Sequence, residues 1–484
     1  MSNFLAIDQG TSSSRAIVFD SKFNVVIDSQ KEYKLSYPND GWVEANPADI
    51  LNTVKETVSN VLKNDDPIAA CGITNQREST IVWSKETGEP IYPAIIWQDR
   101  RTHRFCRELK DNGYEEMVRE KTGLVIDPYF SATKIKWILD NVSGARDLAD
   151  GGKLMFGTVD SFLIYSLTKE KKHYTDVTNA SRTMLFNIKN MEWDKDLLDL
   201  FGIPLSMMPL VQPCDGNFGT LEVNKNISLK GVIGDQQAAL VGQNCFNYGD
   251  IKSTYGTGCF LMVNTKEKII TIDEGLLTTV AYQLNKETSY AIEGSIYSCG
   301  NIIQWLRDKM KFFADAKDSE SFLNEDGNSK NVHFLPAFNG LGAPYWDSGI
   351  RGGFYGITQD SDNTDLITAA FKSICYQTRD ISDLLKKNDI KIKSLFIDGG
   401  MTSNKTFCQL LSNTLQVNIF KPTNIESTAL GACIVSQVAE GLSINDINSK
   451  FENIYKADIG VADFYNDDYL AWKEYIERTI SSIK

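Results

Sequence analysis

Residues 4–19 read FLAIDQGTSSSRAIVF, and the fold is decided in this stretch. Two short runs of β-type residues, 4–8 and 15–20, flank a polar turn of glycine and four hydroxyl side chains. This pattern predicts strand–turn–strand and not strand–turn–helix. A further strand is predicted at about 24–28.

A fainter version of the same pattern occurs about half a chain later. Residues 255–263 read YGTGCFLMV, in which a Gly/Thr turn is again followed by an apolar run. Two such hairpins suggest a duplicated fold with a boundary near residue 244, that is, domains at 1–244 and 245–484. Gly-Thr turns are common, so the pattern alone is weak support for this division.

The rest of the chain alternates predicted strands and helices, which indicates the α/β class. A helix is predicted at 47–63, with Asn46 as its N-cap, Pro47 in its first turn, and an apolar face containing Val54 and Val58. Further helices are predicted at 100–110, 131–140, 160–168, 235–243, 301–313, 364–387, 403–415 and 462–483. Buried strands are predicted at 67–73, 80–83, 252–263, 289–292 and 394–398.

Composition narrows the functional classes. The 484 residues include 63 Asp and Glu against 50 Lys and Arg, a net charge of −13, which argues against a dedicated nucleic-acid binder. Nucleotides remain possible ligands, since backbone N–H groups can hold phosphate. No apolar stretch is long enough to predict a membrane span, and the first residues lack the features of a signal peptide.

The nine cysteines are scattered without any C-x-x-C spacing, so neither a structural zinc site nor a disulfide framework is expected. This cysteine usage fits a reducing cytoplasm. Only three histidines occur, His103, His173 and His333. The chemistry is therefore expected to come from carboxylates.

Neither the P-loop motif nor G-x-G-x-x-G occurs. Instead, three separate Gly-rich turns follow strand-like runs, at 8–12, 255–258 and 398–400. Such turns bring backbone N–H groups close to phosphate, and Asp8 could hold Mg²⁺ or one of its waters. Each turn taken alone is more simply a tight turn between strands.

Three further segments have both a structural and a chemical interpretation. Asp235 lies at a predicted helix start, where it is either an N-cap or a general base facing a cleft. Arg77 and Glu78 are either a solvated surface pair or a donor and an acceptor for a polyol. Trp97 precedes charged residues that, by themselves, suggest a buried ring beside a solvated charge run.

Taken in order, these segments resemble the FGGY carbohydrate kinase family, and within it the members that act on glycerol. The resemblance runs from residue 4 to about 475, and both signature regions of the family are present, at 130–141 and 352–371. Lys372 departs from the family, which usually has an acidic or amide residue there. The motifs that carry the resemblance are 8–15, 72–78, 97–101, 123–131, 234–240, 253–260, 340–347 and 398–400.

The resemblance implies two actin-like/hexokinase-like (ribonuclease H-like) domains flanking a cleft, and ATP-dependent phosphorylation of glycerol with Mg²⁺. Asp235 corresponds to the catalytic base and Asp8 to the acid near Mg²⁺. The residues that correspond to glycerol contacts are Arg77, Glu78, Tyr129, Asp235 and Gln236, with Trp97 and Phe260 as aromatic walls. Those that correspond to the ATP site are Thr11, Ser12, Ser13, Arg15, Gly256, Thr257, Gly300, Gln304, Gly400 and Asn404.

The resemblance also implies a homodimer or homotetramer in the cytoplasm, with glycerol and ATP as its small-molecule partners. Residues 221–230 read LEVNKNISLK, without the Gly-rich, Arg-containing loop or the regulatory histidine found in some relatives. Control by fructose 1,6-bisphosphate or by histidine phosphorylation is therefore expected to be absent or altered. The alternatives are a kinase of this family for another polyol or ketose, and an actin-like ATPase that acts on a protein partner.

Overall fold

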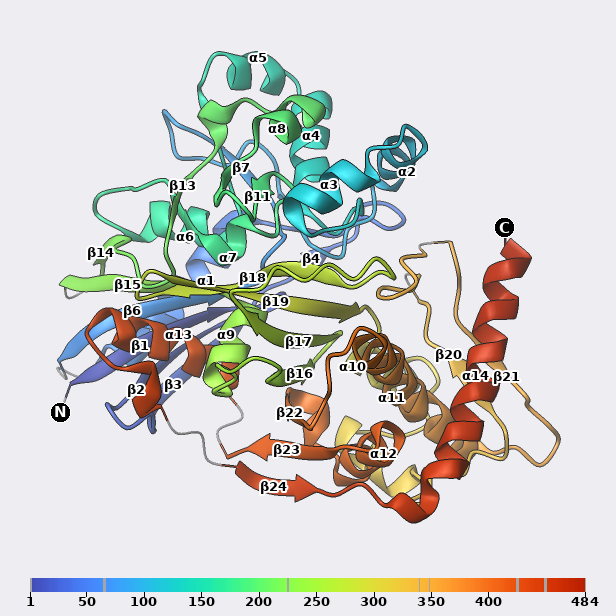
Figure 1. Cartoon of the computed structure of the whole chain (residues 1–484). Helices are drawn as coiled ribbons and strands as arrows, with labels where there is room; N and C mark the ends of the chain where they lie inside the picture. The colour runs from blue at the N-terminus through green and yellow to red at the C-terminus, as the bar shows by residue number, and fades with distance from the viewer. Residues whose placement is uncertain are drawn as a thin grey trace.

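The computed structural model describes residues 2–63, 67–223, 226–338, 340–347, 349–423, 426–447 and 451–483. Each half of the chain contributes one large mixed sheet, and helices flank both sheets (Figure 1). This is the α/β class that the sequence predicts. In the described part of the chain, no helix combines the length and the apolarity that crossing a membrane requires.

The first sheet has the strand order β14-β15-β6-β1-β2-β3. Strand β1 pairs antiparallel with β2, with Asp8 opposite Arg15, and parallel with β6. The predicted strand–turn–strand at the N-terminus is therefore confirmed. The strands are β1 (Asn3–Gln9), β2 (Ser13–Phe19), β3 (Val25–Glu32), β6 (Ile68–Asn75), β14 (Gly219–Glu222) and β15 (Asn226–Gly234).

The second sheet has the order β18-β19-β17-β16-β22-β23-β24. The predicted strand at 252–263 is wrong as a single element, because the turn at 256–258 divides it into the antiparallel pair β16 and β17. The strands are β16 (Ile251–Tyr255), β17 (Cys259–Lys266), β18 (Leu277–Leu284), β19 (Glu287–Ile296), β22 (Ser394–Asp398), β23 (Asn418–Pro422) and β24 (Phe451–Tyr455).

The two sheets share one arrangement. In each, three antiparallel strands are followed by two parallel ones: β3-β2-β1 then β6-β15, and β19-β17-β16 then β22-β23. The β1–β2 turn and the β16–β17 turn hold equivalent places. Their similarity in the sequence thus reflects a repeated architecture.

Two helices join the halves. Helix α9 (Asp235–Gly242) follows β15, and α13 (Ser427–Ala439) packs on α9 and on β1, β6 and β15 of the first sheet (Figure 1). Helix α13 lies so close to α9 that a Cβ at Gly431 would be 1.9 Å from the backbone oxygen of Ala238. Only glycine fits there.

Local signals explain several helix ends. Helix α1 (Pro47–Val61) begins after Asn46, whose side chain accepts a 3.0 Å hydrogen bond from the backbone N–H of Ala48. Helix α14 (Ala462–Ile483) has the predicted bounds. The helix predicted at 301–313 ends earlier, as α10 (Gly300–Asp308), and Lys311 beyond it has a positive φ of 59°.

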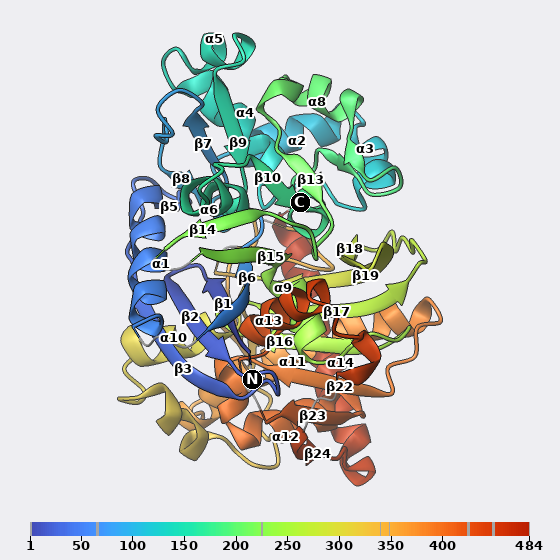
Figure 2. The same cartoon turned by 90° about the vertical axis from the view of Figure 1, so that its left-hand side faces the viewer.

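Most other predicted helices occur within a few residues of their expected ends, whereas α3, α5, α7, α8 and α13 were not predicted. Helices α2 to α6 and α8 gather at one end of the molecule (Figure 2). The remaining helices are α2 (His103–Asp111), α3 (Glu115–Thr122), α4 (Ser131–Asn141), α5 (Ala145–Asp150), α6 (Val159–Leu167), α7 (Val177–Ala180), α8 (Lys195–Phe201), α11 (Asn363–Lys387) and α12 (Lys405–Leu415), with the 3₁₀ helices η1 (Leu205–Met207), η2 (Ala316–Phe322), η3 (Gly400–Ser403), η4 (Ile444–Asp446) and η5 (Ile459–Val461).

Short strands complete the fold: β4 (Leu35–Ser36), β5 (Glu44–Ala45), β7 (Ile81–Ser84), β8 (Ala94–Ile95), β9 (Leu154–Gly157), β10 (Tyr174–Asp176), β11 (Phe186–Asn187), β12 (Glu192–Trp193), β13 (Leu210–Gln212), β20 (His333–Leu335) and β21 (Gly353–Tyr355). The segment 221–230, in which regulatory features were sought, lies in the β14–β15 hairpin. Its residues Asn224 and Lys225 are outside the described residues.

Candidate active site

Two adjoining pockets contain most of the residues that the sequence singled out. The small pocket encloses about 130 Å³ and the large pocket about 450 Å³. Gly256 and Thr257 of the β16–β17 turn line both pockets. The small pocket is lined by Thr11, Gln76, Arg77, Glu78, Trp97, Tyr129, Asp235, Gln236, Thr254, Gly256, Thr257, Gly258 and Phe260, which include every residue predicted to contact glycerol.

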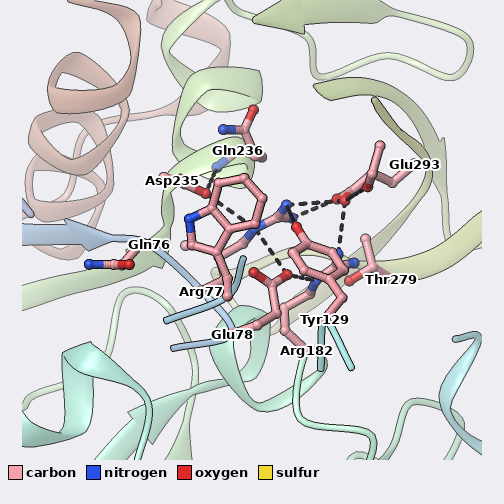
Figure 3. A network of polar contacts seen from close by, with 12 residues as sticks. Gln76, Arg77, Glu78, Tyr129, Arg182, Asp235, Gln236, Thr279 and Glu293 are labelled. Atoms are coloured by element: carbon pink, nitrogen blue, oxygen red, sulfur yellow. Dashed lines mark hydrogen bonds and ion pairs between the residues drawn. The ribbon is translucent and has the colours of Figure 1, made fainter. Parts of the chain in front are cut away.

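Arg77 and Glu78 follow the end of β6 and are both only 2% exposed. The interpretation as a solvated surface pair is therefore wrong. The Nε of Arg77 lies 3.6 Å from Glu78 and 3.2 Å from Oδ1 of Asp235. Its Nη2 donates to the hydroxyl of Tyr129 at 3.3 Å. One buried cation thus contacts three of the predicted glycerol-binding side chains (Figure 3).

Two buried residues of this network were not found from the sequence. Glu293 on β19 accepts two hydrogen bonds from Arg77, and Arg182 just beyond α7 donates to both Glu78 and Glu293. Each comes from a segment without a Gly-rich turn or an acid–base pair. For Arg182 the available signal was the mostly polar run at 175–183, which contains a short helix start. Every residue of this run is buried, and its only apolar members are Val177 and Ala180.

Asp235 is the first residue of α9, and Gly234 takes the N-cap position in place of it. Its Oδ1 accepts the backbone N–H of Gln236 at 2.7 Å, and its side chain is 28% exposed toward the small pocket. Burial raises the pKa of the Asp235 carboxyl, and the charge of Arg77 opposes that rise. The group is thus a reachable carboxylate whose proton affinity is tuned by its surroundings.

Aromatic rings form one side of the small pocket. The ring of Trp97 meets those of Tyr129 and Phe260 edge to face, with centroids 5.7 and 5.8 Å apart. The indole Nε1 donates to the hydroxyl of Thr11 at 2.9 Å, which fixes the ring against the first hairpin. The charges after Trp97 are not a solvated run, because Asp99 and Arg101 form a buried ion pair.

A buried lysine holds Gln236. The ammonium of Lys252 on β16 donates to Oε1 of Gln236 at 2.5 Å and to the hydroxyl of Thr254 at 3.0 Å. Because its oxygen is occupied, Gln236 has its amide N–H groups left for other partners. Desolvation lowers the pKa of Lys252 to about 8.

The large pocket lies between α10, η2 and the Gly-rich turn that begins η3. Of the predicted nucleotide contacts, the lining includes Gly256, Thr257, Gly300, Gln304, Gly400 and Asn404. The backbone N–H of Gly300 donates to the oxygen of Gly256 at 2.8 Å, so these turns are held together. Other lining residues are Tyr255, Ile303, Arg307, Ala316, Lys317, Ser319, Glu320, Phe371, Met401 and Ser403.

The first hairpin lies apart from the large pocket. Thr11 lines the small pocket, whereas Ser12, Ser13 and Arg15 line neither. Arg15 pairs with Asp28 at 2.8 Å and with Glu426 at 2.5 Å. The structure thus separates these residues of the predicted ATP set from those around the large pocket.

Asp8 lies at the end of β1 near this hairpin. Burial and the charges of Asp235 and Glu426 raise the pKa of its carboxyl to about 7. A carboxylate with such neighbours would be stabilised by a bound cation. Among the described residues no group of three or more His, Cys, Asp or Glu side chains forms a ready-made metal cage, and Mg²⁺ needs none, since it keeps most of its water ligands.

The chain matches known protein families and proteins over nearly its full length. Residues 3–242 match the model of the FGGY family of carbohydrate kinases, N-terminal domain, and residues 251–440 match that of the C-terminal domain. A glycerol kinase of Marinomonas sp. (strain MWYL1) is 50% identical over 463 residues, covering 94% of this chain and 93% of that protein.

Solved structures agree as well. A Plasmodium falciparum glycerol kinase with ADP superposes with a TM-score of 0.89 at 33% identity, over 99% of this chain and 98% of that one. A ligand-bound xylulose kinase from Lactobacillus acidophilus also gives 0.89, at 22% identity over 100% of this chain and 99% of that one. At that identity the second likeness shows the fold alone.

Proposed function

Because the chain belongs to the FGGY family of carbohydrate kinases, we propose that it transfers the γ-phosphoryl group of ATP to glycerol, giving sn-glycerol 3-phosphate. The glycerol kinases that it resembles over nearly its full length support this choice of acceptor. The expected domains at 1–244 and 245–484 would then contribute the acceptor side and the nucleotide side of one site.

One observation carries the proposal: the turn at Gly256 and Thr257 lines both pockets. The small pocket has the volume and polar groups for a three-carbon polyol, and the large pocket has room for a nucleotide. A phosphoryl group bound at this shared turn would lie between a donor and an acceptor. Phosphoryl transfer depends chiefly on such positioning and on stabilising charge.

In this proposal Asp235 is the general base that takes the proton of the attacking hydroxyl. Such a base typically contributes about 10²–10⁴-fold to the rate. Arg77, Glu78, Tyr129 and Gln236 would hydrogen-bond the glycerol hydroxyls, and the rings of Trp97 and Phe260 would cover its carbon atoms. A site that pairs each hydroxyl disfavours analogues that leave buried polar groups unpaired.

The phosphates would meet backbone N–H groups of the turns at Thr11–Ser13 and Gly256–Thr257, with Arg15 near the first. Gly300, Gln304, Gly400 and Asn404 would hold the remainder of the nucleotide. Asp8 would hold Mg²⁺ directly or through water, and the ion would supply charge neutralisation at the phosphates. The negative charges of Asp235 and Glu426 raise the pKa of Asp8, and a cation beside Asp8 would offset them.

We propose that the protein acts in the cytoplasm. All nine cysteines are free and buried, and free thiols stay reduced in that compartment. We further propose a homodimer or homotetramer, which light scattering on the purified protein would test. A monomer at micromolar concentration would contradict that assembly.

The deciding experiment is a coupled assay of ADP release with glycerol and with a panel of polyols and ketoses. Glycerol should give the highest kcat/KM, with glycerol 3-phosphate identified as the product. A higher kcat/KM for a ketose would favour a different kinase of the same family. ATP hydrolysis without any phosphorylated acceptor would favour the actin-like ATPase alternative.

A further inference from the structure

Glu293 lies behind the wall of the small pocket and does not line it. The residue is on β19 in the second sheet, and its side chain is fully buried. Its carboxylate accepts from Nη1 of Arg77 at 2.5 Å and from Nη2 at 3.1 Å, so it takes one whole edge of that guanidinium. The hydroxyl of Ser295 donates a further bond at 2.8 Å.

Arg182 completes the arrangement from the first half of the chain. It donates Nε to Glu78 at 2.7 Å and Nη2 to Glu293 at 2.8 Å. Its guanidinium also lies 5.7 Å from the ring centroid of Tyr129. The turn that carries Arg182 follows α7, whose first N–H groups are capped by the buried Asp176.

These contacts decide which way Arg77 and Glu78 face. With Nη1 and Nη2 of Arg77 on Glu293, only its Nε edge is directed at Glu78 and Asp235 (Figure 3). Without Glu293, the nearest remaining anions for Arg77 would be Glu78 and Asp235 themselves. The guanidinium would then turn toward the side chains that the acceptor needs.

We propose that Glu293 and Arg182 are positioning residues of the small pocket: Glu293 holds the guanidinium of Arg77, and Arg182 holds the carboxylate of Glu78, in the orientation that receives the acceptor. The inference rests on the proposed phosphorylation of glycerol. Since Glu293 belongs to the second sheet and its two arginine partners, Arg77 and Arg182, to the first half, the orientation of the acceptor groups is set across the two halves.

The test compares KM for glycerol with KM for ATP in Glu293→Gln, Arg182→Lys and Ser295→Ala. Glu293→Gln keeps the shape and removes the charge, so KM for glycerol should rise about 10- to 100-fold, the loss expected for charge-assisted hydrogen bonds. Arg182→Lys should give a smaller rise. Ser295→Ala removes one donor to Glu293, is mild enough to fold, and should raise the same KM about threefold. KM for ATP should stay within about twofold.

The matched control is Asp468→Asn, which neutralises a carboxylate that is largely but not fully buried, pairs with Lys372 and lines neither pocket. It should lower the thermal midpoint and leave KM for glycerol unchanged. If Ser295→Ala and Arg182→Lys, like the control, lower the thermal midpoint but leave KM for glycerol unchanged, the cluster is structural and the proposal is overturned. Failure of the wild-type protein to phosphorylate glycerol would instead refute the proposed function.

Discussion

The Nε of Arg77 lies 3.2 Å from Oδ1 of Asp235, so one buried cation touches both the pocket wall and the proposed base. Burial raises the pKa of Asp235, and Arg77 opposes this rise. The same contact orients the carboxylate toward the small pocket.

Asp235→Asn should therefore abolish most transfer, by about 10²–10⁴-fold in kcat, because the amide cannot accept the proton. ADP affinity, measured by calorimetry, should change little, since Asp235 does not line the large pocket. Asp250→Asn, a carboxylate outside both pockets, is the control and should keep normal turnover. Near-normal turnover of Asp235→Asn would refute the general-base role.

Trp97→Ala should raise KM for glycerol about 10-fold or more, because it removes the ring that packs on Tyr129 and Phe260. KM for ATP should change much less. Trp97→Phe keeps most of the apolar wall but loses the hydrogen bond to Thr11, so its effect should be small. Steady-state kinetics with each substrate varied in turn distinguishes these outcomes, and equal effects on both KM values would count against an acceptor-specific wall.

The pH dependence should reflect Lys252, whose pKa burial lowers to about 8. Above that pH the amine is neutral and holds Oε1 of Gln236 less strongly, so kcat/KM for glycerol should fall. Lys252→Met should lower the activity and weaken this alkaline decline. Some decline should remain, because Lys134, which donates to the backbone oxygens of Glu78 and Tyr129, also has a pKa lowered to about 8.

The contribution of Lys252 to stability should rise with pH over the alkaline range in which the activity falls. The pKa of Lys252 is about 8 in the folded protein against 10.5 for an ordinary lysine, so between these values the unfolded chain binds the extra proton. The contribution of Lys252 to the free energy of unfolding therefore rises from pH 8 to 10.5. Urea titrations of wild type and Lys252→Met at pH 7.5 and about 9.5 would measure this difference. A parallel loss of activity and of the Lys252 contribution to stability would contradict it.

Lys372, the residue that departs from the family pattern, is buried on α11 and pairs with Asp468 on α14. Its ammonium also donates to the backbone oxygen of Gly327 and the hydroxyl of Ser329, each at 2.9 Å. Lys372→Met should cost about 3–5 kcal/mol in the free energy of unfolding, because Asp468 loses its cation. Arg478→Ala, which breaks an exposed pair with Glu474 on the same C-terminal helix, should cost less than about 1 kcal/mol. Similar losses of unfolding free energy in Lys372→Met and Arg478→Ala would show that the burial of the Lys372–Asp468 pair adds nothing to its contribution to stability.

Gly431→Ala should destabilise the junction of the halves, since the added Cβ would lie 1.9 Å from the backbone oxygen of Ala238. The neighbouring backbone cannot retreat without moving α9, which carries Asp235. Both the thermal midpoint and kcat should therefore fall. Ala439→Gly, at the end of the same helix, should cost only about 1 kcal/mol through helix propensity. A normal midpoint for Gly431→Ala would contradict the close helix contact.

The sequence was sufficient where a signal is local. The two hairpins, the capped helix α1 and the helix α14 each depend on residues close together in the chain. Helix α13 was missed because it is apolar on nearly every side and lacks the one-sided periodicity that marks a surface helix.

The small pocket was predicted through motifs, and all its expected residues do gather there. The roles of Glu293 and Arg182 could not be found in that way. Neither belongs to one of those motifs, and each acquires its role only when distant strands and turns meet. For the first hairpin the motif was found but the placement of its side chains was not. A motif alone does not tell which pocket its side chains reach, and Ser12, Ser13 and Arg15 line neither pocket.

Helix α13 comes late in the chain yet lies on strands of the first sheet, and its buried residues form one core with Phe4, Ala6 and Phe19. Neither half therefore has a complete core of its own. A fragment ending near residue 244 would expose the surface that α13 covers. Heat or urea should accordingly unfold the whole chain in one step. Any opening and closing around the pockets must leave the packing of α13 on the first sheet intact. The contact between α13 and α9 would then act as the hinge of that motion.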